Sequence, residues 1–208
     1  MKKTIALLVI TAFVCGLLSL TACTSAKAQD TASFADVAAD AWYAGAVAYV
    51  QEQGLMNGNT ATEFAPEESL TRAMLATVVY RLAGEPPVNG SPEFTDVPAG
   101  QWYSNAIIWA TQQGVVNGYG GGLFGPEDPI TREQLAVMLW RYAGSPAAPD
   151  GELAFTDAEQ VGAYAREALG WAVQTGVMNG KGGGVLDPKG LATRAQAASM
   201  LRNFLENG

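Results

Sequence analysis

The stretch GPEDPITREQLAVMLWRYAG, residues 125–144, decides the fold. In it a proline-containing loop leads into a Thr-Arg pair, and an apolar helical pattern follows. Two other stretches have the same design: APEESLTRAMLATVVYRLAG, residues 65–84, and DPKGLATRAQAASMLRNFLE, residues 187–206. Internal similarity of this kind is the signature of a repeat architecture. The sequence therefore predicts three copies of one structural unit.

Other short motifs recur in the same order in each copy. FADV, FTDV and FTDA begin at positions 34, 94 and 155, and GLMNG, GVVNG and GVMNG begin at positions 54, 114 and 176. Pro- and Gly-rich connectors, EPPVNGSP and SPAAPDG, separate the copies. We expect the repeats at residues 34–84, 94–144 and 155–206.

Each copy reads as a helix, a loop and a second helix. The first helix is expected to run from an aromatic residue, Trp42, Trp102 or Tyr164, to the Gly of the next motif, a plausible stop signal. In the second helix, apolar residues at offsets 4, 7, 8 and 11 from the Thr predict a buried face. A lone helix pair cannot bury its apolar faces. We therefore predict one mainly α-helical domain, in which three helix-loop-helix units share a pseudo-threefold core.

Composition excludes several classes of function. The chain has no histidine, and its two cysteines, Cys15 and Cys23, lie in the first 23 residues, so His-based catalysis and the common zinc motifs are excluded. We expect no cofactor, no metal and no catalytic residue. The net charge is −8, and an acidic chain lacks the basic stripe that nucleic acid requires.

The first 33 residues predict export. Lys2, Lys3 and the apolar run over 5–18 are typical of a signal peptide, expected at 1–22. LTAC, residues 20–23, resembles a bacterial lipobox, in which Cys23 would be lipidated and become the first mature residue, followed by a linker to residue 33. Cleavage after Ala28 is the alternative. The chain is expected in the cell envelope or at the cell surface, as a membrane-anchored lipoprotein if the lipobox is used.

The Thr of each Thr-Arg pair stands where a helix N-cap is expected. Gln134 and Gln196 follow three residues after their Thr, so both predict Thr-x-x-Gln capping boxes.

The Arg that follows each Thr stands where the helix macrodipole disfavours a cation. One interpretation is an anion site made by the guanidinium and free backbone N–H groups. The other is a structural ion pair with Asp36, Asp96 or Asp157. The aromatic residues also have two interpretations, as core residues or as platforms for a sugar ring.

The ordered series of Phe-x-Asp-Val, Trp, Gly-Val-Val-Asn-Gly, Phe-x-Pro and Ile-Thr-Arg resembles the S-layer homology (SLH) repeat of bacterial envelope proteins. The resemblance covers residues 34–206 and implies a pseudotrimeric helical domain that binds acidic, often pyruvylated, cell-wall polysaccharide in grooves between repeats. It assigns the Arg side chains to the acidic group and the Trp and Gly residues to the groove lining. The expected ligand-binding residues are Arg72, Arg132, Arg194, Trp42, Trp102, Asp36, Asp96, Asp157, Gly122, Gly184, Gln134 and Gln196.

The copies depart from the family pattern in different ways. The family motif commonly ends Thr-Arg-Ala-Glu, whereas its fourth residue here is Met74, Gln134 or Gln196. Copy three has Tyr164 in place of Trp and Leu186 in place of Phe, and copy one lacks the Gly run. We therefore expect three unequal sites, of which the one with Arg132 is the most orthodox.

Three classes of function follow. The first is a wall-binding module without catalytic activity, which would tether the envelope if Cys23 joins it to a membrane. The second is an envelope scaffold or assembly protein whose repeats contact other proteins. The third is a glycosidase that draws a carboxylate pair from Asp96, Glu127, Asp128 and Asp157.

Overall fold

The computed structural model describes residues 34–148 and 153–207. The expected signal peptide, lipobox and linker lie outside these residues. The described chain is helical, with no strand longer than an isolated bridge. Its α-helices are α1 (Ala44–Glu52), α2 (Arg72–Leu82), α3 (Ser104–Gln112), α4 (Arg132–Tyr142), α5 (Arg166–Gln174) and α6 (Arg194–Asn207), and two 3-10 turns, η1 (Ala158–Gln160) and η2 (Ala163–Ala165), precede α5.

The second helix of each repeat begins at the Arg of the Thr-Arg pair, as predicted. The preceding Thr caps it, because its Oγ1 accepts from the N–H three residues on, at 3.2 Å in α2 and 3.3 Å in α4 and α6. The full capping box forms in α4, where Gln134 Oε1 also accepts from the Thr131 N–H at 3.0 Å. The capping box predicted for Gln196 is wrong, since its Oε1 accepts instead from Arg132 Nη1.

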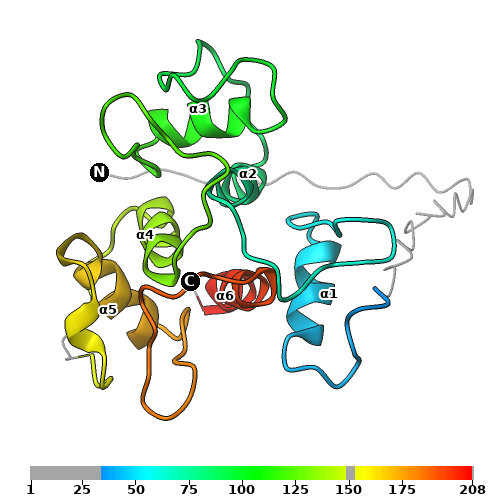
Figure 1. Cartoon of the computed structure of the whole chain (residues 1–208), viewed down its shortest axis with the longest axis vertical. Helices are drawn as coiled ribbons and strands as arrows, with labels where there is room; N and C mark the ends of the chain where they lie inside the picture. The colour runs from blue at the N-terminus through cyan, green and yellow to red at the C-terminus, as the bar shows by residue number, and fades with distance from the viewer. Residues whose placement is uncertain (1–33, 149–152, 208) are drawn as a thin grey trace, which may run out of the picture.

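The two helices of one repeat do not form the main helix pairs of the domain. Instead, α2 packs against α3, α4 against α5, and α6 against α1, so the second helix of each copy pairs with the first helix of the next. Figure 1 shows the result, with α2, α4 and α6 at the centre and α1, α3 and α5 around them. Because copy three pairs with copy one, the three repeats close into a ring.

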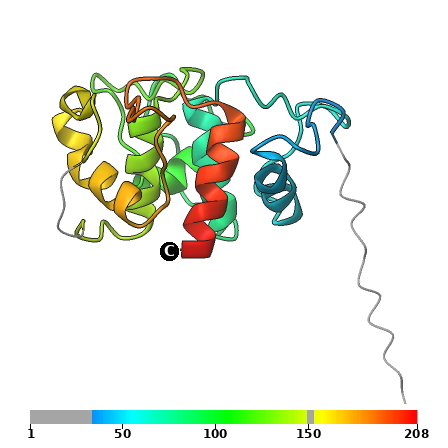
Figure 2. The ribbon, with the colours of Figure 1, turned by 90° about the horizontal axis from the view of Figure 1, so that it is seen from below.

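A cycle of three backbone hydrogen bonds lies where the inner helices begin. Leu70 N–H donates to Ala192 O, Ala192 N–H to Ile130 O, and Ile130 N–H to Leu70 O, each at 2.9 Å. Short antiparallel bridges flank the cycle, such as Thr71 with Pro129. From this end the inner helices run side by side through the domain (Figure 2). The cycle closes the ring of repeats through hydrogen bonds alone, and it needs all three repeats to be complete.

One hydrophobic core joins all three repeats. Most of the predicted stripe is buried, for example Leu75, Leu135 and Leu201, whereas Leu82 and Tyr142 are half-buried at its edge. Ring contacts such as that of Tyr142 with Phe204 at 6.0 Å link α4 to α6. The mainly α-helical, three-repeat prediction is therefore confirmed. Within the described ranges, no helix is both long and apolar enough to cross a bilayer.

Candidate functional site

The Arg at the start of each inner helix reaches into the loop of the next repeat. Arg72 Nε donates to Phe124 O at 2.8 Å, and Nη2 donates to Asn117 O at 2.9 Å. The same two bonds recur from Arg132 to Leu186 O and Asn179 O, at 3.0 and 2.8 Å. They recur again, at 2.7 Å each, from Arg194 to Phe64 O and Asn57 O. The three buried guanidinium groups thus tie the ring of repeats together.

The Asp of each Phe-x-Asp motif holds the same loop from its other side. Asp96 accepts from the N–H groups of Phe124 and Gly125 at 2.8 and 2.7 Å, so the backbone of Phe124 is held at N–H by Asp96 and at C=O by Arg72. Partial burial raises the pKa of Asp96, but these N–H donors outweigh burial and hold that pKa below its usual value.

Asp36 and Asp157 have the same arrangement. Asp36 accepts from Phe64 N–H and Ala65 N–H, and Asp157 accepts from Leu186 N–H at 2.9 Å. For Asp157 the N–H of Leu186 is the main cause of a lowered pKa. These Asp residues therefore shape the loops that carry the Arg partners.

The expectation of free N–H groups at the helix starts is wrong. The first two amides of α2 donate to the next repeat, Arg72 N–H to Asp128 O and Ala73 N–H to Pro126 O, both at 3.0 Å. The starts of α4 and α6 repeat the pattern with carbonyls of residues 188, 190, 66 and 68. Since the Thr side chain takes the third amide, an anion at this place must contact side chains.

The alternative of an Arg-Asp ion pair is also wrong. Within residues 34–148 and 153–207, no carboxylate oxygen lies within 4.0 Å of Arg72, Arg132 or Arg194. Burial lowers the pKa of Arg132, and the more distant Asp187 and Asp157 oppose that shift. Arginine stays protonated in proteins, so each repeat junction contains a positive charge that neutral carbonyls hold in place.

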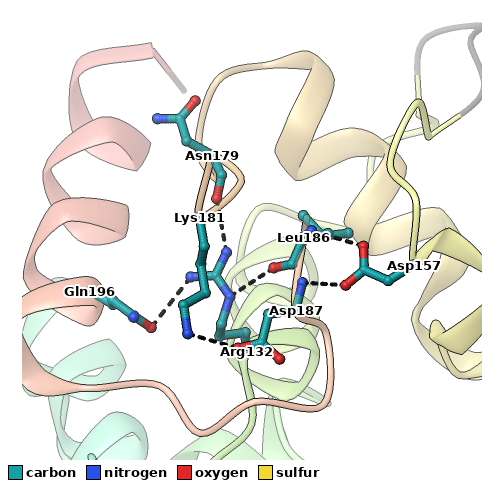
Figure 3. Close-up of polar contacts among 7 residues, drawn as sticks. All are labelled: Arg132, Asp157, Asn179, Lys181, Leu186, Asp187 and Gln196. Carbon is teal, nitrogen blue, oxygen red and sulfur yellow. Dashed lines mark hydrogen bonds and ion pairs between the residues drawn. The ribbon is translucent and has the colours of Figure 1, made fainter. Parts of the chain in front are cut away.

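Arg132 lines a cavity between the repeats. It has a volume of about 760 Å³ and draws its lining from all three repeats. Arg132 comes from copy two, the Asn179–Lys181 loop and one face of α6 from copy three, and Trp42 from copy one. Figure 3 shows the Arg132 guanidinium between the Asn179 and Leu186 carbonyls, with Gln196 Oε1 3.3 Å from Nη1. We call this cavity the Arg132 groove.

Trp42 is 67% exposed and Trp102 is 58% exposed, so the interpretation of these rings as core residues is wrong. Each contacts the next Tyr edge to face, at 5.2 Å between centroids for Trp42 and Tyr43 and 5.1 Å for Trp102 and Tyr103. Two of the first helices, α1 and α3, begin two residues after the Trp, so the ring stands before the helix rather than on its buried face. Trp42 therefore lines the Arg132 groove with an exposed ring.

A smaller cavity of about 250 Å³, the Arg72 groove, is related to the first by the pseudo-threefold arrangement. Its lining includes Arg72, Gly118, Gln134, Arg141 and Tyr164. Tyr119 also lines it and lies against the Arg72 guanidinium, 4.4 Å from ring centroid to Cζ. The Arg72 groove therefore has the smaller volume, and two tyrosines line it.

Glu133 holds Tyr164, one of the two tyrosines that line the Arg72 groove. This carboxylate is buried and accepts from Tyr164 Oη and Lys189 Nζ at 2.6 Å each, and from Gly162 N–H at 3.0 Å. Burial raises the pKa of Glu133, but these donors outweigh it and lower the pKa. Copies one and three have Ala73 and Ala195 at this position, so the clamp is particular to the junction of copies two and three.

Both glycines expected in the site lie outside the two grooves. Gly122 and Gly184 have φ angles of +77° and +76° and are exposed, and their carbonyls accept from Thr95 and Thr156 N–H. The lining glycines are instead those of the Asn-Gly pairs. A Cβ at Gly118 would lie 2.5 Å from both Leu123 O and the Phe94 ring, so this motif lets a loop pack on the Phe of its own repeat.

Several lining residues were missed because their pattern in the sequence was not followed. On α6 they are Ser199 and Asn203, at offsets 6 and 10 from the Thr, beside the apolar stripe and next to the expected Gln196. On α4 they are Val137 and Arg141, next to the expected Gln134. The residue after each Asn-Gly was missed as well, Lys181 in one groove and Tyr119 in the other. The part of the chain that the structure describes holds no His, Cys, Asp or Glu group suited to a metal ion.

The fold and grooves define a module built from three repeats, with cavities that lie between the repeats. The S-layer homology domain matches three times, at residues 33–74, 93–136 and 154–198. This chain belongs to the S-layer homology domain family, which places it among modules that anchor proteins at the cell surface.

Its relatives are much longer proteins. An amylopullulanase of Thermoanaerobacterium thermosulfurigenes is 32% identical over 174 residues, 80% of this chain and 9% of the relative. Exoglucanase XynX of Acetivibrio thermocellus is 32% identical over 197 residues, 92% of this chain and 18% of the relative. An S-layer protein of Bacillus thuringiensis subsp. finitimus is 32% identical over 177 residues, 81% of this chain and 21% of the relative. The chain spans a small part of each of them.

Proposed function

We propose that this chain binds an acidic cell-wall polysaccharide non-covalently, without catalysis, and that the Arg132 groove is its principal site. A polymer that carries a carboxylate, such as a pyruvate ketal, matches the charge of this groove. Similarity to S-layer proteins and to enzymes of very different activity supports a shared anchoring role, because each is similar to this chain over less than a quarter of its length.

One observation carries the proposal: Arg132, which has no ion-pair partner among the described residues, lines a groove together with a largely exposed Trp. Arg132 is only 4% exposed and its Nε and Nη2 are taken by carbonyls, which fixes its orientation. Its Nη1 donates to Gln196 Oε1 at 3.3 Å, a long bond, so a carboxylate can take a shorter, charge-assisted bond from Nη1 and accept a second bond from the Gln196 side-chain amide. Trp42 supplies the apolar face on which a sugar ring stacks.

The test is a pull-down of the purified protein with wall sacculi, before and after chemical removal of the secondary polymer. Arg132 is a poor target, since its loss also breaks two bonds between repeats. The informative variants are Trp42→Ala and Gln196→Ala, and the matched control is Leu205→Ala, an exposed apolar side chain of α6 that lines neither cavity. Circular dichroism verifies that each variant is folded.

We expect wild type and Leu205→Ala to sediment with untreated sacculi, and Trp42→Ala and Gln196→Ala to sediment much less. Stripped sacculi should retain none of the four proteins. Equal retention of all four on stripped sacculi would contradict polymer binding and favour contacts with wall proteins.

The leader supports a second proposal, that Cys23 is lipidated and joins this module to a membrane. Fatty-acid labelling in cells should mark the wild type and not a Cys23→Ala variant, which should leave the membrane fraction. An unlabelled wild type whose mature chain begins at Gln29 would instead show cleavage after Ala28.

A further inference from the structure

The Arg132 groove contains more positive charge than one Arg supplies. Lys181 and Arg202 line it together with Arg132, and Glu67 is the one carboxylate among its lining residues in the described chain. The whole protein has a net charge of −8. Three cationic side chains on the lining of one groove in an acidic molecule point to a local electrostatic role, because the overall charge would repel an anionic partner.

The two added cations lie on different walls of the groove. Lys181 belongs to the loop of copy three, and in Figure 3 its side chain runs beside Arg132 toward Asp187. Arg202 belongs to α6 and lies against α1, since its Nη1 would be 3.1 Å from a Cβ built at Gly45. A ligand that enters over Arg132 therefore meets Lys181 from the loop and Arg202 from the α1–α6 pair.

Both cations form ion pairs that are partly exposed to solvent. Lys181 Nζ lies 2.9 Å from Asp187 Oδ2, and Arg202 Nε lies 2.9 Å from Glu206 Oε1, with Lys181 47% and Arg202 41% exposed. Exposed ion pairs of this kind contribute about 0–1 kcal/mol, so a ligand anion can replace the carboxylate at little cost. The two side chains can thus turn to a ligand while Arg132 stays fixed.

The Arg72 groove lacks this pair of charges. Tyr119 takes the place of Lys181 after the Asn-Gly motif, and Trp140 takes the place of Arg202 on the inner helix. Arg141 gives the Arg72 groove a second cation, but at the position where the Arg132 groove has Asn203. The Lys181 and Arg202 pair therefore belongs to the Arg132 groove and not to the Arg-to-carbonyl contacts that the two grooves share.

We propose that the Arg132 groove binds a polymer segment with two negative charges, the first at Arg132 and Gln196 and the second between Lys181 and Arg202. This inference rests on the proposed function and adds a second anionic subsite to it. The second charge is a carboxylate or a phosphate, since an ammonium and a guanidinium both accept either group.

The experiment measures affinity for polymer fragments that a muramidase releases from sacculi, by isothermal titration calorimetry at low and high salt. The variants are Lys181→Gln, Arg202→Gln and the double variant. Arg166→Gln is the matched control, because it removes one exposed positive charge from α5, outside both grooves. A second titration uses fragments whose carboxylates have been reduced to alcohols.

We expect each single variant to lose about fivefold in affinity at low salt and the double variant more, with smaller losses at high salt. Arg166→Gln should stay near wild type. Carboxyl reduction should weaken binding by every variant, because the first subsite takes a carboxylate. If the reduced fragments still bind wild type more tightly than the double variant, the second charge is a phosphate.

Two results would overturn the inference, and they can be distinguished. If wild type binds the fragments and the double variant binds as tightly as Arg166→Gln, the second subsite is absent while the proposed function stands. If wild type binds neither fragments nor sacculi, the proposed function fails, and the inference fails with it.

Discussion

The Arg132 and Arg72 grooves have the same frame and different linings. In both, a buried Arg donates to two carbonyls of the next repeat, and a helix, a loop and an aromatic residue surround it. The Arg132 groove has the exposed Trp42 and the two added cations Lys181 and Arg202, whereas the Arg72 groove has a third of its volume and a Tyr164 that donates to Glu133. The difference teaches that the repeated Thr-Arg motif builds the ring, while residues that vary between copies decide what each groove can bind.

The largest effect is expected from breaking the shared frame. Arg72→Ala and Arg132→Ala should each destabilise the fold by about 3 kcal/mol or more, because each leaves two carbonyls without their charged donor. Urea unfolding of both variants beside wild type measures the loss. A variant as stable as wild type would show that the Arg is held for a ligand alone.

A smaller loss should separate the two junctions. Glu133→Ala removes the acceptor of Tyr164 Oη and Gly162 N–H and should cost about 2–3 kcal/mol in unfolding free energy. It should leave binding in the Arg132 groove unchanged, since Glu133 lines neither cavity. Loss of sacculus binding by a folded Glu133→Ala protein would mean that the Arg72 groove contributes to retention.

The same carboxylate predicts a pH dependence. The pKa of Glu133 is lowered in the folded state, so the unfolded chain takes up a proton first as the pH falls. Its contribution is complete above the unfolded pKa of about 4.3 and is lost as the pH falls through the lower folded value. Urea unfolding from pH 7 to 3 should show a shallower decline for Glu133→Gln than for wild type. Parallel declines would show that Glu133 does not contribute to the pH dependence of stability.

Loss of the exposed ring should affect binding rather than stability. Trp42→Ala should weaken polymer binding by about tenfold, a cost of about 1.4 kcal/mol, with little change in unfolding free energy. Tyr164→Phe keeps a ring but loses the bond to Glu133, so it should lower the unfolding free energy with little change in polymer binding. Calorimetric titration and urea unfolding of both variants test this contrast. Equal losses of polymer affinity in the two variants would contradict it.

The smallest effect concerns a glycine placed in the site by sequence resemblance. Gly184→Ala should cost about 1 kcal/mol in stability, because its φ of +76° disfavours a side chain. Polymer affinity should not change, as Gly184 lines neither groove. A loss of affinity in a stable variant would return Gly184 to the binding site.

Local patterns in the sequence were sufficient for the inner helices and their Thr caps, but not for the capping box expected at Gln196. Leu75, Leu135 and Leu201 follow a helical period, and each Thr stands directly before its helix, so both could be predicted from neighbouring residues. The pairing of α6 with α1 could not, because closure of the ring depends on contacts between residues more than a hundred positions apart.

The amides at the helix starts show why the site could not be predicted from local sequence alone. Their acceptors, such as Pro126 O for Ala73 N–H, belong to another repeat, so the local pattern suggested free donors where none exist. The exposure of Trp42 was unpredictable for a similar reason: α1 begins after it, and helix starts are uncertain by a residue or two. Lys181 could be read from its place after Asn-Gly, but its role depends on Arg132 and Arg202, which other elements bring beside it.

The most direct test of the central claim is a proton–nitrogen NMR titration of the Trp indole signals with muramidase-released polymer fragments. Trp42 is assigned through a Trp42→Phe variant, and the buried Trp171 and the half-buried Trp140, which donates to Pro146 O at 2.8 Å, serve as internal references. The account predicts a saturable shift of the Trp42 signal that Gln196→Ala weakens, with both references unmoved. Binding that leaves the Trp42 signal in place would contradict the assignment of the Arg132 groove as the principal site.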